Sequence, residues 1–277
     1  MCIGGITGDI IGSIYEGMHR NPRRKSFPLF NRRNHFTDDT VLMVATMDVL
    51  LNYSSKTYTT TYKDYFKRYP HAGYGKAFKA WAGSETRESY GSWGNGSGMR
   101  VSPVAWMFDT KEKVLEEAER SACVTHSHPE GIKGAKAIAL AVYLARKGMN
   151  KYGIKKEIIE QTGYDLDVGV LTEWDVSCKG CVPQALIAFF DSSGFEDAIR
   201  KAVLRGGDSD TIAAMTGSIA EAYYGIPEHI TAEVFSRLPK DLADITEEFT
   251  RKYIDPSFKV PPPVDHSWRA IFKWLTL

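Results

Sequence analysis

The chain has few cysteines, almost no net charge and no long apolar run. Its 277 residues include four cysteines, which is too few for a disulfide framework in a chain of this length. A formal net charge of +1 offers no general electrostatic attraction for nucleic acid or for a membrane surface. No apolar stretch approaches the length of a membrane span, and the N-terminus lacks the basic region and cleavage site of a signal peptide. These absences predict a cytoplasmic protein that binds neither membranes nor nucleic acid.

Strand patterns are also scarce, whereas helical patterns are frequent. The segment 57–62 is rich in β-branched and aromatic residues, but it continues to Pro70 as a helix would. Residues 40–52 are apolar on nearly every side, which favours a buried central helix. With no repeat and no linker, the sequence predicts one all-α domain over residues 1–277. The other segments with helical spacing are 132–146, 195–203 and the small-residue run from Thr211 to Gly225.

Two local features have simple interpretations. Cys178-Lys179-Gly180-Cys181 has the spacing of a redox motif or of half a zinc site. No second pair and no βαβ pattern accompanies it, so we interpret these thiols as structural. The basic stretch 19–25, together with Arg32 and Arg33, is interpreted as a solvated loop, with attraction of phosphate as the alternative.

Two acidic clusters, far apart in the sequence, each precede a helical run. They are Thr37-Asp38-Asp39-Thr40 and Gly206-Gly207-Asp208-Ser209-Asp210-Thr211. Because carboxylates repel one another, gathering four of them raises their pKa values unless cations neutralise them. The clusters offer carboxylate and hydroxyl oxygens and contain no Cys or His, which favours Mg²⁺, Mn²⁺ or Ca²⁺. The alternative is that each cluster only supplies the N-cap and the acidic first turn of a helix.

A glycine-rich segment, 89–100, differs in composition from the rest of the chain. Its four glycines alternate with larger residues that include Tyr90, Trp93 and Asn95. Glycines let the backbone approach a ligand closely, so this composition predicts a loop whose N–H groups converge on one bound group.

Taken with the segment Thr125-His126-Ser127-His128-Pro129-Glu130-Gly131, these features resemble the ADP-ribosylglycohydrolase family, the relatives of dinitrogenase-reductase-activating glycohydrolase. The resemblance covers nearly the whole chain. Six motifs in this order are far more specific than any one of them. They are Gly8-Asp9 through Tyr15-Glu16, the segment 37–40, the segment 94–100, the His126 motif, Val182-Pro183, and the segment 206–211.

The resemblance implies an orthogonal helical bundle with two Mg²⁺ or Mn²⁺ ions in a cleft. It implies that Thr37, Asp38 and Asp39 hold one ion and that Glu16, Asp208 and Thr211 hold the other, with Asp210 between them. Such a metal pair orients ribose hydroxyls and polarises a water beside the anomeric carbon, and a carboxylate then accepts the proton. The residues expected to act in catalysis are Asp38, Asp39 and Glu16.

The glycine-rich loop is expected to hold the diphosphate of ADP-ribose, and Trp93 to stack on a ring. A core role for Trp93 is the alternative. His126 resembles the ligand-contacting histidine of the family, whereas His128 is given no role. The residues expected to bind substrate are Ser92, Trp93, Gly94, Asn95, Gly96, Ser97, Met99 and His126.

The expected partner is an ADP-ribosylated protein or a small ADP-ribose conjugate. The His126 motif looks closest to arginine-directed members, so we predict hydrolysis of ADP-ribosyl-arginine. O-acetyl-ADP-ribose and ADP-ribosyl-serine are the alternative substrates. A non-enzymatic ADP-ribose-binding or structural protein of the same fold is the alternative of another class, but such a protein should have lost metal ligands.

Overall fold

The computed structural model describes residues 2–17, 22 and 26–262, and these ranges are helical with no sheet. One isolated antiparallel bridge joins Gly94 to Ser177. The predicted all-α class is therefore confirmed. The helices are α1 (Gly4–Gly12), α2 (Asp38–Leu51), α3 (Tyr58–Arg68), α4 (Lys76–Ala82), α5 (Gly96–Met99), α6 (Ser102–Met107), α7 (Lys111–Cys123), α8 (Pro129–Arg146), α9 (Lys151–Thr162), α10 (Cys178–Phe190), α11 (Phe195–Leu204), α12 (Ser209–Tyr224), α13 (Glu228–Phe235) and α14 (Lys240–Tyr253).

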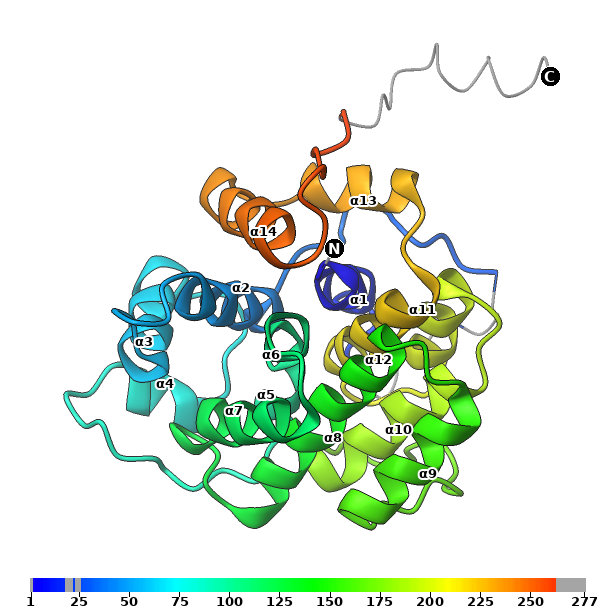
Figure 1. The fold of residues 1–277 in the computed structure, drawn as a ribbon, viewed down its shortest axis with the longest axis horizontal. Helices are drawn as coiled ribbons and strands as arrows, with labels where there is room; N and C mark the ends of the chain where they lie inside the picture. Colours follow the sequence, from blue (N-terminus) through cyan, green and yellow to red (C-terminus); the bar gives the residue numbers. More distant parts are fainter. Residues whose placement is uncertain (1, 18–21, 23–25, 263–277) are drawn as a thin grey trace.

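The pair formed by α1 and α12 lies at the centre of the bundle (Figure 1). Glycines on α1 recur every four residues and therefore lie on one face of the helix. A Cβ atom added to Gly4 would lie 2.2 Å from the carbonyl oxygen of Gly217, and one added to Gly12 would lie 2.5 Å from Cα of Asp210. The two backbones are thus in direct contact, as the small residues after Thr211 predicted.

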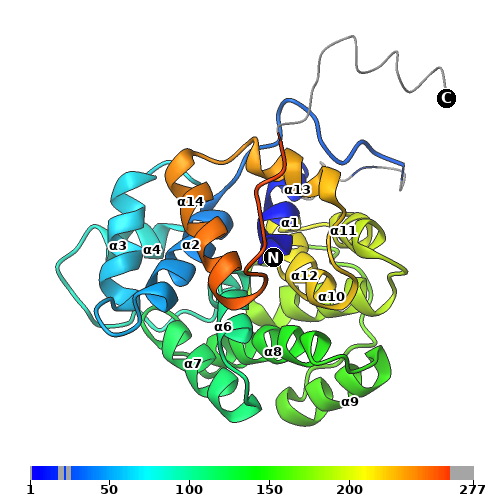
Figure 2. The same ribbon diagram turned by 45° about the horizontal axis from the view of Figure 1, so that its top comes forward.

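The other helices surround this pair. Helix α2 packs on α1, α3, α6 and α14, whereas α8 packs under α12 and contacts α5, α7, α9 and α10. Turning the molecule brings α13 and α14 forward, above the end of α1 (Figure 2). Residues 39–51 of α2 are all buried, so the prediction of a buried central helix is confirmed.

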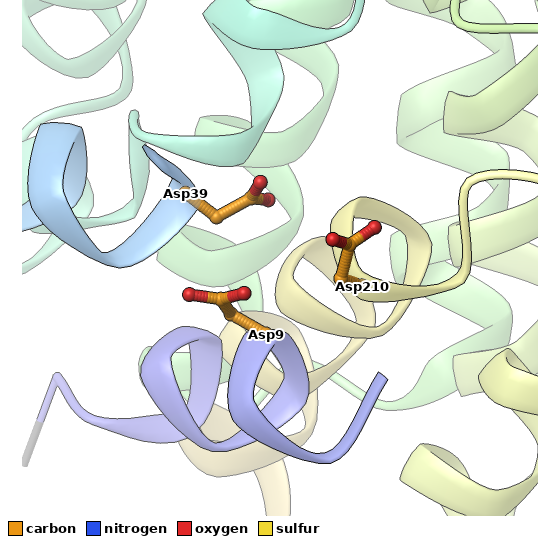
Figure 3. A group of neighbouring side chains, drawn as sticks. All are labelled: Asp9, Asp39 and Asp210. Atoms are coloured by element: carbon orange, nitrogen blue, oxygen red, sulfur yellow. The ribbon is translucent and has the colours of Figure 1, made fainter. Parts of the chain in front are cut away.

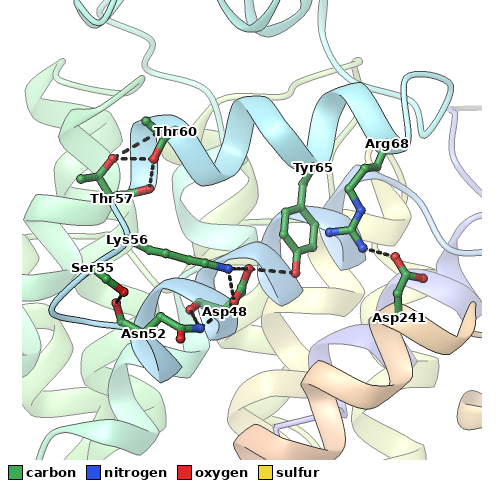
Figure 4. A network of polar contacts seen from close by, with 9 residues as sticks. All are labelled: Asp48, Asn52, Ser55, Lys56, Thr57, Thr60, Tyr65, Arg68 and Asp241. Atoms are coloured by element: carbon green, nitrogen blue, oxygen red, sulfur yellow. Dashed lines mark hydrogen bonds and ion pairs between the residues drawn. The ribbon is translucent and has the colours of Figure 1, made fainter.

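A polar network fixes α2 against α3 and α3 against α14 (Figure 4). The carboxylate of Asp48 on α2 accepts hydrogen bonds from Lys56 Nζ at 2.6 Å and from the Tyr65 hydroxyl at 3.3 Å. Arg68, one turn further along α3, pairs with Asp241 on α14. These contacts hold the C-terminal half of α2 in place. The N-terminus of the same helix carries Asp38 and Asp39.

All four cysteines are free thiols, and two of them hold the first turn of α10 against the glycine-rich segment. The Cys178 thiol donates to the carbonyl oxygen of Gly94 at 3.1 Å, and the Asn95 amide donates to the sulfur of Cys181 at 3.3 Å. These contacts agree with the structural interpretation of the pair. The basic stretch 19–25 lies outside the described residues except for Pro22. None of the helices in the described ranges combines the length and apolar character needed to cross a membrane.

Candidate metal centre and substrate cleft

The two acidic clusters of the sequence meet at a cavity of about 440 Å³. The clusters lie at the N-termini of α2 and α12, and both N-termini border this cavity. Glu16 reaches the cavity because the Gly17 N–H donates to the carbonyl oxygen of Gly207 at 3.0 Å, which ties the segment after α1 to the second cluster. The acidic residues and threonines that line the cavity are Glu16, Thr37, Asp38, Asp39, Asp208, Asp210 and Thr211.

Two groups of three carboxylates lie close enough to hold metal ions. Asp9, Asp39 and Asp210 form one group, in which the oxygens lie within 4.8 Å of one another. Figure 3 shows these side chains pointing into a common space from α1, α2 and α12. Glu16 and Asp208 form the second group, again with Asp210. Asp210 belongs to both groups, and its expected place between two ions stays a prediction.

The composition of these groups differs from the expected one. Asp38, which was expected to bind the same ion as Asp39, belongs to neither group and lies partly exposed at the cavity wall. The Thr37 hydroxyl donates to Asp9 at 2.7 Å instead of standing free. The Thr211 hydroxyl, expected beside Asp208, donates to Asp39 at 3.1 Å. Residues of the two clusters therefore contact one another, and neither cluster forms a carboxylate group by itself.

Sequence reasoning gave no role to Asp9, although it lies at the centre of the site. One of its oxygens accepts hydrogen bonds from the backbone N–H and hydroxyl of Thr40 at 3.1 and 2.5 Å, and from the Thr37 N–H at 2.8 Å. The other oxygen accepts only the Thr37 hydroxyl, which leaves it a free lone pair. Asp9 thus caps α2 from α1 and can also bind an ion. Its place in the Gly8-Asp9 motif, which carries part of the family resemblance, is the sequence signal that could have identified it.

The alternative that the clusters are simple helix caps accounts for only part of the geometry. Thr37 does cap α2, since its hydroxyl accepts the Asp39 N–H at 3.4 Å. Asp208 is the N-cap residue of α12, but its side chain accepts no backbone N–H of that helix. It instead accepts the Asn95 amide at 2.6 Å, which joins the start of α12 to the glycine-rich segment. Helix capping therefore does not explain why Asp208 is an aspartate.

The chemistry of these groups fits divalent cations. All the donors are oxygens, and Oδ1 of Asp39 is buried with no hydrogen-bond partner in the described residues. A buried carboxylate oxygen without a donor is costly, and a cation would satisfy it. Burial, with added repulsion from Asp9 and Asp208, raises the pKa of Asp38 to about 8. Burial and neighbouring carboxylates likewise hold the pKa values of Asp39 and Asp210 well above the usual range.

Most of the residues expected to bind substrate line the same cavity. The segment before α5 is held there by the Asn95 N–H, which donates to the Val176 carbonyl at 2.8 Å. The predicted loop ends earlier than expected, because residues 96–99 form α5. The expected residues that line the cavity are Ser92, Gly94, Asn95, Gly96, Met99 and His126.

Two of the expected binding residues lie elsewhere. The Ser97 side chain is fully buried and donates to the carbonyl oxygen of Gly131 at 2.7 Å, so it holds α5 against α8. Trp93 is 55% exposed and is not among the residues that line the cavity. His128 does not line the cavity either, and its ring caps α8 by accepting the Glu130 N–H.

Sequence reasoning missed several residues that line the cavity. They are Lys76, Phe78, Tyr90, Arg100 and Trp174.

A family model described as ADP-ribosylglycohydrolase matches residues 1–256. The chain belongs to the ADP-ribosylglycohydrolase family. It is similar to mouse (Mus musculus) ADP-ribosylhydrolase ARH3, with 27% identity over 261 residues and 70% of each chain covered. ADP-ribosylarginine hydrolase Tri1 of Pseudomonas putida (strain GB-1) is 24% identical over 293 residues, which cover 87% of this chain and 75% of Tri1.

Among solved structures, an ADP-ribosylglycohydrolase-related protein complex shares the fold. The TM-score is 0.73 at 22% identity, and the match covers 91% of this chain and 96% of the other. This likeness shows the fold, whereas the family model and the curated relatives support a glycosidic-bond hydrolase, as predicted. The alternative of another class, a non-enzymatic ADP-ribose-binding or structural protein, is not favoured.

Proposed function

We propose that the chain hydrolyses the bond between ADP-ribose and an acceptor in a reaction that requires two divalent cations, Mg²⁺ or Mn²⁺. The observation that carries this proposal is the pair of three-carboxylate groups that share Asp210 in one cavity. The glycine-rich segment lines the same cavity, so one ligand can contact both. An ADP-ribosylated protein or a small ADP-ribose conjugate is the proposed partner.

The proposed ligand sets follow the two carboxylate groups. Asp39 and Asp210, with the free lone pair of Asp9, would hold one ion, and Glu16, Asp208 and Asp210 the other. The hydroxyls of Thr37 and Thr211, which already contact these carboxylates, would complete the sets. When bound, the ions would supply Lewis-acid polarisation of the ribose hydroxyls and of the attacking water.

The residues of the chain have separate tasks in this scheme. The segment around Gly94 and Gly96 binds the diphosphate through backbone N–H groups. Asp38, which lies at the accessible wall beside the metal ligands, accepts the proton from the attacking water. The water oxygen joins the anomeric carbon, and the leaving group departs and takes up a proton. The surrounding carboxylates stabilise the positive charge that develops on the sugar ring.

For the acceptor, we propose arginine. The similarity to Tri1, whose name specifies ADP-ribosylarginine, supports this choice. A wall rich in carboxylates also suits a cationic guanidinium leaving group. ADP-ribosyl-serine and O-acetyl-ADP-ribose are the alternatives, and the ARH3 relatives, whose name specifies no acceptor, are compatible with either.

One experiment tests the activity and the acceptor together. The protein is incubated with arginine-linked and serine-linked ADP-ribosylated proteins and with O-acetyl-ADP-ribose, and free ADP-ribose is measured by mass spectrometry. Each reaction is run with Mg²⁺, with Mn²⁺ and after removal of metal by a chelator. Release from the arginine conjugate that depends on added metal supports the proposal. Full release by metal-free protein contradicts the metal requirement, and release from serine or acetyl conjugates alone contradicts the choice of arginine.

A further inference from the structure

Arg100, directly after α5, has an unusual environment. Its side chain is fully buried, and it forms no ion pair with any carboxylate in residues 2–17, 22 and 26–262. The guanidinium lies over the ring of Tyr62, 4.4 Å from its centroid. Its Nη2 donates to the Ser121 carbonyl at 3.2 Å and to the Thr125 hydroxyl oxygen at 2.7 Å. A buried charge without a carboxylate partner is costly, so its hydrogen bonds are its main compensation.

The Thr125 hydroxyl links Arg100 to His126. Its oxygen lies 2.7 Å from Arg100 Nη2 and 2.7 Å from Nδ1 of His126. Because a guanidinium is only a donor, the hydroxyl oxygen must accept from Arg100. Thr125 is fully buried, so its own proton needs an acceptor, and the described residues offer it Nδ1 of His126 and no other. Nδ1 is therefore unprotonated, and the ring proton lies on Nε2.

The Nε2 atom of His126 faces the substrate cavity. It lies beside the glycine-rich segment, where a Cβ atom added to Gly96 would be 3.0 Å from it and one added to Gly94 would be 3.7 Å away. His126 lines the cavity with Tyr90, whose ring centroid lies 6.0 Å from the imidazole. Burial, assisted by the charge of Arg100, keeps the pKa of His126 well below its usual range. The ring is thus neutral, with one N–H directed toward the ligand space.

We propose that Arg100 and Thr125 are positioning residues that hold His126 in the Nε2–H tautomer, so that it donates a hydrogen bond to an acceptor atom of the ligand. The inference rests on the proposed function in one respect, since it takes ADP-ribose as the ligand. It also specifies the binding role expected for His126, because it names Nε2–H as the group that donates to the ligand. The segment around Gly96 must then remain free of side chains to let an acceptor reach Nε2.

The tautomer can be measured directly. Protein labelled with ¹⁵N-histidine is studied without ligand and with Mg²⁺ by long-range ¹H–¹⁵N correlation, and the His126 signals are assigned with the variant His126→Gln. The native protein and Thr125→Ser, which keeps the hydroxyl, should show the Nε2–H tautomer. Thr125→Val, which removes the hydroxyl at nearly constant volume, should lose this single state and populate the Nδ1–H form.

Calorimetry with ADP-ribose provides the second readout. Thr125→Val should weaken binding roughly threefold to tenfold, as expected for one hydrogen bond, and Thr125→Ser should restore it. Thr246→Val removes an equally buried hydroxyl on α14, which bonds the carbonyl of Leu242, and should change neither the tautomer nor the affinity.

An Nδ1–H tautomer in the native protein would overturn the inference, and so would an unchanged tautomer and affinity in folded Thr125→Val. If Thr125→Val does not fold, the tautomers of the native protein and Thr125→Ser still decide. Because the tautomer is measured without ligand, its outcome is separate from that of the proposed function. The proposed function would instead fail through absence of ADP-ribose binding and turnover in the native protein.

Discussion

Gly8 on α1 lies against the carbonyl group of Ala213 on α12 so closely that a Cβ atom at Gly8 would be 2.0 Å from the carbonyl oxygen. This contact determines the geometry of the metal centre. Asp9 is the next residue on α1, and Asp210 precedes Ala213 by one turn of α12. The separation of their carboxylates therefore depends on the approach of the two backbones, which only glycine allows.

Gly8→Ala should destabilise the protein, although alanine favours helix formation by about 1 kcal/mol over glycine. The clash involves backbone atoms, which cannot rotate away, so the free energy of unfolding should fall by roughly 1–3 kcal/mol or more. The helices must also separate, which should weaken Mn²⁺ binding.

Denaturant titration measures the change in the free energy of unfolding, and calorimetry measures the change in Mn²⁺ affinity. Gly169→Ala, at a site with open space around it, is the control and should change neither quantity. Equal stability of Gly8→Ala and the native protein would contradict the close contact.

Asp210→Asn tests whether the acidic residues bind metal or only cap helices. A cap residue contributes about 1 kcal/mol and has no direct part in turnover. As the shared member of both carboxylate groups, Asp210 should instead be required for both ions, so metal binding and activity should fall by orders of magnitude. The metal-free variant should be at least as stable as the native protein, because a repelling charge has been removed. Near-native turnover by the folded variant would favour the capping alternative.

Much of this site could be predicted from the sequence, because its ligands lie within short segments. The oxygens of Thr37, Asp39 and Asp210 are presented by helix N-termini, and cap residues followed by apolar runs are readable without a structure. The role of Asp9 could not be read in this way. It depends on hydrogen bonds from α1 to residues 28 and 31 positions later, and local spacing does not determine which helix ends meet.

The aromatic residues were harder to place for a related reason. Trp93 lies within the glycine-rich segment, but the backbone there pairs with residues 176–178, and the indole is turned to solvent. The same pairing brings Trp174 and Val176 to the cavity from a part of the chain with no recognisable motif. Tertiary packing, and not the composition of the loop, decided which tryptophan lines the site.

Replacement of the two tryptophans by alanine should therefore have different effects. Trp174→Ala should reduce the affinity for ADP-ribose by the equivalent of about 1–3 kcal/mol if the indole stacks on the base. Trp93→Ala, an equally large truncation outside the cavity lining, should leave the affinity nearly unchanged. Calorimetry with ADP-ribose compares them under the same conditions. The opposite order would return the stacking role to Trp93, as the sequence alone suggested.

Metal-free protein should become less stable as the pH rises. The folded-state pKa of Asp38 is about 8, against a usual value of 3.8, and the pKa values of Asp39 and Asp210 are raised in the same direction by burial first. A carboxyl group with a raised pKa stabilises the fold fully below its unfolded-state pKa, and this stabilisation is lost as the pH rises to the folded-state pKa. The loss should occur between about pH 4 and pH 8 and reach a few kcal/mol.

Denaturant titration in the presence of a chelator, at several pH values between 5 and 8, measures this loss. Added Mg²⁺ should oppose it increasingly toward pH 8, since the ion binds the ionised carboxylates of the folded state. Asp38→Asn removes one of the titrating groups and should give a shallower pH dependence. A free energy of unfolding that stays constant or rises over this range in metal-free protein would contradict the raised pKa values of these carboxyl groups.

The acceptor preference can be tested through Lys76, a cation at the start of α4 that lines the cavity. Asp38 lines the same cavity, beside Gly73, where an added Cβ atom would lie 3.2 Å from Oδ1 of Asp38. A positive charge at this wall opposes a guanidinium leaving group but has little effect on a neutral serine. Lys76→Gln should therefore raise kcat/KM for ADP-ribosyl-arginine up to about fivefold, the range of an exposed charge interaction, and leave kcat/KM for ADP-ribosyl-serine nearly unchanged.

Lys79→Gln is the control, because it makes the same charge change on the same helix outside the cavity, and it should alter kcat/KM for neither substrate. If Lys76→Gln and Lys79→Gln change both substrates equally, the leaving group does not pass this wall, and the choice of arginine must depend on residues elsewhere around the cavity.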